Sequence, residues 1–260
     1  TVSAQTTVNY TEFEQKVLDY SQTLKQSVSQ RTAMQKAMKA AKTAFFPAVD
    51  ATGSYQYRIN KYDMDFGGMA VPMEHDSYSA EVGVVQPIYA GGSIYHTYKA
   101  SQIQSQIADK SVDLTTDNLI YAAEASYWGT AAQKEMYKTM CQYVEIISQL
   151  TKVLQDKYDD GYISKTDLIQ MQTRLKEAEL QRSSSYQSYQ IALQNMNVLM
   201  GLEPNKEVGL VDSIFVELPL PAYVGADAAL NVRPDYAISQ LDVDYQKRQV
   251  KLAAAKYNPS

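Results

Sequence analysis

The stretch from Ser77 to Gly92, SYSAEVGVVQPIYAGG, decides the fold expected for this chain. Its first residues alternate between apolar side chains and small or polar ones, which is the period of a β-strand with two different faces. The alternation stops at Gln86-Pro87, and Gly91-Gly92 follows. No proline occurs between Pro87 and Pro204, and this region has a helical pattern. We therefore expect a two-faced strand that leads directly into a very long helix.

A partner for this strand precedes it in the sequence. Residues 49–60 alternate in the same way, and a polar loop over 61–76 joins the two stretches into an expected antiparallel hairpin. Asp50, Arg58 and Glu81 lie on the polar face. Twelve residues span about 40 Å, which is enough to cross a bilayer at a tilt. Strands of a soluble sandwich also alternate, but two strands alone are marginal, so we favour a membrane barrel completed by other chains.

Helical periodicity covers most of the remaining chain. We expect helices over residues 10–46 with a capped break at Ser21, over 93–156, over 165–200 and over 224–257. The helix over 93–156 would be about 95 Å long. The turn after it contains Gly161, and Ser164 with Asp167 resembles a capping box. Small and aromatic residues replace most Ile and Leu along the stripe of the helix over 165–200, which favours packing of several helices side by side.

Composition excludes several classes of function. The chain has 260 residues, 21 of them tyrosines, and a formal net charge of −5, without the clustered basic face that nucleic acid requires. The single Cys141 allows no intrachain disulfide or CxxC motif. No catalytic or phosphate-binding motif is present, and Glu74-His75-Asp76 is better interpreted as a solvated loop than as a metal site. We therefore predict no enzyme activity, no cofactor, no metal and no nucleic-acid partner.

An internal repeat connects the two ends of the chain. Lys39–Pro47 (KAAKTAFFP) and Lys251–Pro259 (KLAAAKYNP) align at an offset of 212 residues. In both copies a helix rich in Ala and Lys ends in an aromatic residue two positions before a proline. The hairpin follows the first copy, so we expect a second copy of the whole unit to follow the second.

Four motifs together give the chain a family resemblance. They are Gln86–Gly92 (QPIYAGG), Tyr158–Leu168 (YDDGYISKTDL), Leu199–Gly201 (LMG) and Arg233–Asp235 (RPD). With them the chain resembles the TolC-like outer-membrane efflux family over nearly its whole length. The resemblance covers the first of the two family repeats and the start of the second.

The resemblance implies a mainly α fold of the helical-tunnel type, truncated, with one transmembrane-type β-hairpin. It divides the chain into N-terminal helices over 1–46, the barrel hairpin over 47–92 and a periplasmic helical hairpin over 93–201 with its tip at 157–167. An equatorial connector follows over 202–223, and residues 224–260 are the lead-in helix of the second repeat. Pro87, Gly91 and Gly92 would form the joint between strand and helix.

The resemblance also implies a function and its partners. The chain would form a homotrimer in the outer membrane of a Gram-negative bacterium, in contact with outer-membrane lipid, and would extend into the periplasm as a passive exit duct. A periplasmic adaptor would dock at the tip, at Asp160, Gly161, Ser164 and Asp167, and link the duct to an inner-membrane transporter for efflux or type I secretion. Asp167 would help to hold the closed state. The alternative is a coiled-coil interaction protein without channel activity.

Overall fold

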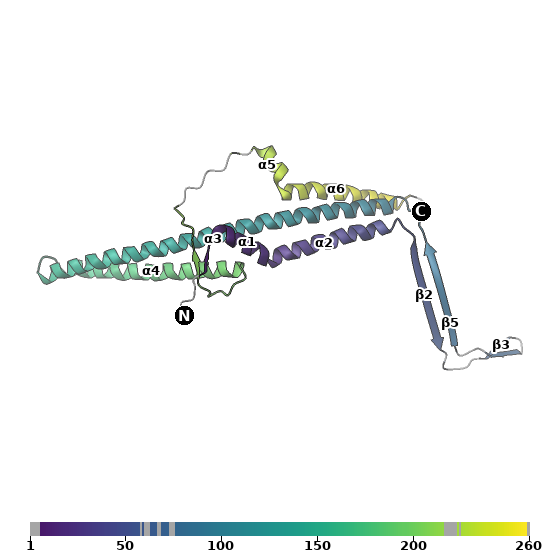
Figure 1. The fold of residues 1–260 in the computed structure, drawn as a ribbon, viewed down its shortest axis with the longest axis horizontal. Coiled ribbons are helices and arrows are strands. Elements are labelled where there is room, and N and C mark those ends of the chain that lie inside the picture. Colours follow the sequence, from purple (N-terminus) through teal and green to yellow (C-terminus); the bar gives the residue numbers. More distant parts are fainter. Residues whose placement is uncertain are drawn as a thin grey trace. The chain divides into compact units, whose positions relative to one another are not determined.

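The fold was taken from a computed structural model, which describes residues 6–57, 59, 63–66, 69–72, 76–215, 223 and 225–258. Long antiparallel helices and a β-hairpin dominate it, which confirms the predicted fold class (Figure 1). The chain divides into two compact units. One contains Thr1–Gln30 and Lys110–Ala237, and the other contains Arg31–Asp109 and Ile238–Ser260.

The helices follow the predicted pattern closely. Ser21 separates the first two helices and caps the second, because the Leu24 N–H donates to Ser21 Oγ at 3.2 Å. The helix predicted over 224–257 is interrupted at Arg233, since a residue before proline is pushed out of the helical region. None of the described helices is long and apolar enough to cross a membrane. The bounds are α1 Tyr10–Tyr20, α2 Gln22–Thr43, α3 Ser93–Asp159, α4 Lys165–Leu199, α5 Ala226–Val232 and α6 Pro234–Ala255.

The predicted hairpin is present in the second unit. Strand β2 (Ala48–Tyr57) pairs antiparallel with β5 (Asp76–Val85) over ten residue pairs. The polar loop expected over 61–76 contains a short antiparallel pair that was not predicted, β3 (Asp63–Phe66) with β4 (Met69–Pro72), and its last residue already belongs to β5. Their four-residue length is too short for the alternation to be read from sequence.

The first unit has a compact core that the sequence did not reveal. Strands β1 (Thr6–Val8) and β6 (Val208–Leu210) pair in parallel, and both lie outside the predicted elements. They cover the middle of α3 and the end of α4. The core residues share near-complete burial, and the largest side chains among them are Phe13, Tyr127 and Met196. The others are Val8, Val17, Ala123, Leu193, Met200, Val208 and Leu210.

The internal repeat extends well beyond the nine residues visible in sequence. Both α2 and α6 have 22 residues, and each boundary of α6 lies 212 positions after that of α2. The residues before them, Ser21 and Arg233, donate their N–H groups to Val17 O and Ala229 O, which are also 212 positions apart. The ends match too, since Phe45 N–H bonds Lys42 O as Tyr257 N–H bonds Ala254 O. The two copies therefore share their start, length and end.

Candidate functional site

The tip between α3 and α4 begins with a Schellman turn. Helix α3 continues to Asp159, three residues beyond its predicted end, and Gly161 follows with φ +79°. The Tyr162 N–H bonds Lys157 O at 2.8 Å, and the Gly161 N–H bonds Tyr158 O at 2.9 Å. This is the pair of hydrogen bonds that a left-handed glycine allows at a helix end. The predicted permissive role of the Gly161 backbone is confirmed.

The other side of the tip is the predicted capping box. The Asp167 N–H donates to Ser164 Oγ at 3.2 Å, and the Ser164 N–H donates to Asp167 Oδ2 at 3.4 Å. Ser164 Oγ also donates to the same carboxylate oxygen at 2.7 Å. Two N–H groups that the start of α4 would leave unpaired are thus satisfied by its own first turn.

All four predicted tip residues are exposed. Asp160 and Gly161 lie on the α3 side, and Ser164 and Asp167 lie on the α4 side. A Cβ atom built on Gly161 meets nothing within 4 Å, and the Tyr162 side chain is 80% exposed. The tip is therefore a short, rigidly capped turn whose side chains face outward, which suits a surface that another molecule contacts.

The predicted joint in the second unit depends on two left-handed glycines. Gly91 has φ +59° and Gly92 has φ +86°. A Cβ atom on Gly91 would lie 2.5 Å from the carbonyl oxygen of Ala255, so the end of α6 leaves no room for a side chain there. Asn258 Nδ2 donates to Gly91 O at 3.0 Å and fixes this close approach. Pro87 lies in the irregular segment between β5 and these glycines.

The hairpin presents two chemically different faces. Paired residues of an antiparallel sheet point to the same side, so each face can be read from the register. One face carries the apolar pairs Val49–Val84, Ala51–Val82 and Tyr55–Tyr78. Its large side chains are 59–87% exposed: Val49, Tyr55, Tyr57, Tyr78, Val82 and Val84. A row of exposed apolar side chains of this length marks a contact with a membrane or another protein.

The opposite face of the hairpin is polar except at the Ala48–Val85 pair. Ser54 Oγ and Ser79 Oγ are hydrogen-bonded across the strands at 2.9 Å, and Thr52 pairs with Glu81. Asp50 lies opposite Gly83, and its carboxylate occupies the space that a side chain at position 83 would fill. Arg58, which we placed on the same face, lies outside the described residues.

One polar cluster in the first unit was not predicted. The Tyr127 hydroxyl is buried and lies 2.7 Å from Asp212 Oδ2 and 3.1 Å from Val8 O. The Tyr10 N–H donates to the same Asp212 oxygen at 2.8 Å. Burial, and then the hydrogen bond to Asp212, raise the pKa of Tyr127 above its usual range. The cluster ties β1 and the segment after β6 to α3, and no local sequence signal connects these residues.

Together, these features combine a two-faced hairpin, a glycine joint and a long helical hairpin in one chain. The chain belongs to the outer membrane efflux protein family, whose model matches residues 14–202. This confirms the resemblance drawn from the four motifs. No curated protein matched the sequence.

Two solved outer-membrane proteins illustrate the similarity in fold. The Campylobacter jejuni CmeC outer membrane channel superposes with a TM-score of 0.81 at 15% identity, covering 94% of this chain and 52% of that one. The Vibrio cholerae outer membrane protein VceC gives a TM-score of 0.76 at 13% identity, with 95% and 58% covered. The chain thus spans about half the length of these channels. At such low identity the likeness establishes the fold alone.

Proposed function

We propose that this chain is part of the outer-membrane channel component of a tripartite efflux or type I secretion system. Three copies would form a passive exit duct in the outer membrane of a Gram-negative bacterium and extend into the periplasm. A periplasmic adaptor would dock at the tip and connect the duct to an inner-membrane transporter. No chemical step is required of the protein, because transport through a duct depends on its shape and on opening.

The observation that carries this proposal is the exposed apolar face of the β2–β5 hairpin. In the chain itself, β2 and β5 pair only with each other among the described strands, so both outer edges lack partners. Lipid cannot satisfy open strand edges, and a membrane sheet therefore has to close on itself. Strands from further hairpins would complete the barrel, with lipid against the apolar face and the polar face toward the lumen.

The proposal assigns a role to each segment. Residues 1–46 supply N-terminal helices and 47–92 the barrel hairpin, with the Gly91–Gly92 joint turning the chain into the periplasm. Residues 93–201 form the helical hairpin of the tunnel, and 202–223 form the equatorial connector. Residues 224–260 are the lead-in helix of a second repeat. Opening would separate the helices on either side of Gly161.

Adaptor docking is tested best at Gly161. Gly161→Trp adds a large side chain to an open, exposed position, and Gly161→Asn is the matched control because asparagine tolerates the left-handed conformation. We expect the tryptophan variant to lose export and adaptor cross-linking in cells while the asparagine variant keeps both. If the tryptophan variant keeps both export and cross-linking, the tip is not part of the surface at which the adaptor docks.

The role of Asp167 in the closed state has to be separated from its role as a cap. Ser164→Ala and Asp167→Ala each break the capping box, at a cost of about 1 kcal/mol. If Asp167 also holds the tip closed, only Asp167→Ala should raise the conductance of the full-length channel in a planar bilayer. Equal conductance in the two variants would show that Asp167 acts only as a helix cap and does not hold the tip closed.

A further inference from the structure

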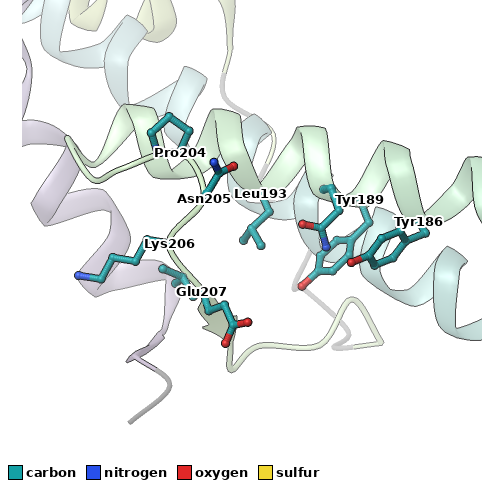
Figure 2. Close-up of a pocket in the computed structure, with 9 residues that line it drawn as sticks. Tyr186, Tyr189, Leu193, Pro204, Asn205, Lys206 and Glu207 are labelled. Atoms are coloured by element: carbon teal, nitrogen blue, oxygen red, sulfur yellow. The ribbon is translucent and has the colours of Figure 1, made fainter. Parts of the chain in front are cut away.

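A groove with a polar and aromatic lining separates α4 from the segment that follows it in the first unit. It has a volume of about 300 Å³, at the lower end for small-ligand sites. Four α4 residues at helical spacing form one wall, and residues 204–208 form the other (Figure 2). The residues used below are Tyr186, Tyr189, Gln190, Leu193, Asn205 and Glu207.

The two tyrosine rings of the groove are held in place. Tyr189 packs against the core of the unit, and the Tyr186 ring lies 5.1 Å from that of Tyr137. Burial, and then the nearby Tyr186 phenol, raise the pKa of Tyr189, so the phenol stays neutral at physiological pH. The groove therefore offers two electron-rich rings whose positions do not depend on a ligand.

The opposite wall is also fixed before any ligand arrives. The buried Asn197 donates through Nδ2 to Pro204 O at 3.0 Å and to Lys206 O at 2.8 Å. Gln194 Nε2 donates to Asn205 Oδ1 at 3.0 Å, which leaves the Asn205 amide N–H groups available. A preformed site avoids the ordering cost that weakens binding by flexible segments.

Of the two charged residues that line the groove, Glu207 lies on the side of the rings. Figure 2 shows the Glu207 carboxylate extending toward the side of the tyrosines, while Lys206 extends away from them. Among the residues that the structure describes, Glu207 forms no ion pair, and the hydroxyls of Tyr186 and Tyr189 form no hydrogen bond within the chain. The unpaired Glu207 carboxylate would therefore repel an anion and attract a cation.

We propose that this groove binds a weakly hydrated organic cation, of the quaternary ammonium or guanidinium type. The faces of Tyr186 and Tyr189 would attract the cation, the Glu207 carboxylate would neutralise its charge, and Leu193 would contact its apolar part. Cation–π attraction is strongest for cations that lose their water easily, which excludes metal ions as the preferred ligand. Gln190 and Asn205 would donate to a hydroxyl or carbonyl group on the same ligand.

Calorimetric titration of the full-length protein in a non-ionic detergent tests this proposal. Choline chloride is the first probe, and 3,3-dimethylbutan-1-ol, which has the same shape without the charge, is its control. We expect saturable binding of choline at one site per chain and binding of the neutral alcohol at least about fivefold weaker. Absence of saturable choline binding, or equal binding of the two probes, would overturn the proposal.

Substitutions locate the bound cation in the groove. Glu207→Gln removes the charge at constant size, and Glu203→Gln makes the same change on the same segment outside the groove lining. We expect the first to weaken choline binding about fivefold or more and the second to leave it within twofold. Equal effects of the two variants would indicate a general charge effect and would refute the site.

A third probe identifies the source of the cation. N-acetyl-arginine amide mimics an arginine side chain of a protein partner, whereas choline mimics a free small molecule. Tighter binding of the arginine mimic would assign the groove to a protein contact, and tighter binding of choline to a small solute. None of these binding measurements requires channel activity. Their results would therefore remain interpretable if the proposed function as a duct were wrong.

Discussion

At the scale of single residues, the buried hydroxyl of Tyr127 organises the core of the first unit. It contacts the Asp212 carboxylate and the Val8 carbonyl oxygen, while its ring packs 5.5 Å from that of Phe13. A buried polar group is costly unless it is hydrogen-bonded, so this hydroxyl stabilises one arrangement of the segments around it. The neighbouring Trp128 ring, 5.4 Å away, is the single tryptophan of the chain and reports on this core.

Tyr127→Phe should lower the free energy of unfolding by about 1–3 kcal/mol, because Asp212 and the Val8 carbonyl lose a buried partner. Denaturant titration followed by Trp128 fluorescence measures the change. Tyr121→Phe, at a side chain that is 75% exposed, is the matched control and should change stability by less than about 0.5 kcal/mol. Equal effects of the two variants would contradict the structural role of the Tyr127 hydroxyl.

Alkaline pH should weaken the same core. Burial, and then the Glu14 carboxylate, raise the pKa of Tyr10 from 10.0 to about 12. A pKa raised on folding means that the folded state favours the neutral phenol, so this stabilisation is complete below pH 10 and is lost as the pH rises toward 12. We expect the unfolding midpoint to fall across this window and Tyr10→Phe to flatten the fall. An unchanged slope in that variant would contradict the assignment.

The predictable residues were those whose interactions are local. Ser164 and Asp167 are three positions apart and could be read as a capping box, and Gly161 follows from its place after a helix. Tyr127 and Asp212 are 85 positions apart, and their hydrogen bond depends on how the segments pack. Sequence patterns carry no information about such a pair, so the sequence indicated the tip but not this cluster.

At the scale of elements, helices and long strands were predictable and short strands were not. The period of β5 is visible because it lasts ten residues, and α3 because its 67 residues contain no proline. Strands β1 and β6 have three residues each, which is less than two full alternations. They exist because the core beneath them and the Tyr127 cluster hold their backbones side by side, which only the folded unit provides.

Two glycines in different elements should respond to alanine in opposite directions. Gly91→Ala places a Cβ atom against the Ala255 carbonyl and forces a left-handed alanine, which should cost about 2 kcal/mol or more. Gly129 lies within α3 with open space around it, so Gly129→Ala should stabilise by about 0.5–1 kcal/mol. Denaturant unfolding of both variants provides the measurement, and a loss of stability in both would contradict this assignment.

At the scale of the whole molecule, the β2–β5 hairpin requires contacts with other elements. Its apolar face and its two open edges both require partners that the described part of the chain does not supply. The proposed trimer supplies them, and the alternative of a water-exposed coiled-coil protein leaves them unexplained.

Cell fractionation separates these two alternatives. We expect the full-length protein to fractionate with outer membranes, to require detergent for extraction and to migrate as a trimer that becomes a monomer only after heating. A variant with Val82 and Val84 changed to Asp should lose the heat-resistant form, because both side chains lie on the apolar face. Full solubility without detergent would instead favour the coiled-coil protein.

From the matching boundaries of α2 and α6 we infer that the two helices descend from one duplicated segment. Of the 22 aligned positions, only Ser27, Lys39 and Ala41 keep the same residue type 212 positions later. On this inference, nearly every side chain of the helix has been replaced while its length and both of its ends were preserved. Helix length and the places where the backbone turns would then be inherited more faithfully than side-chain chemistry.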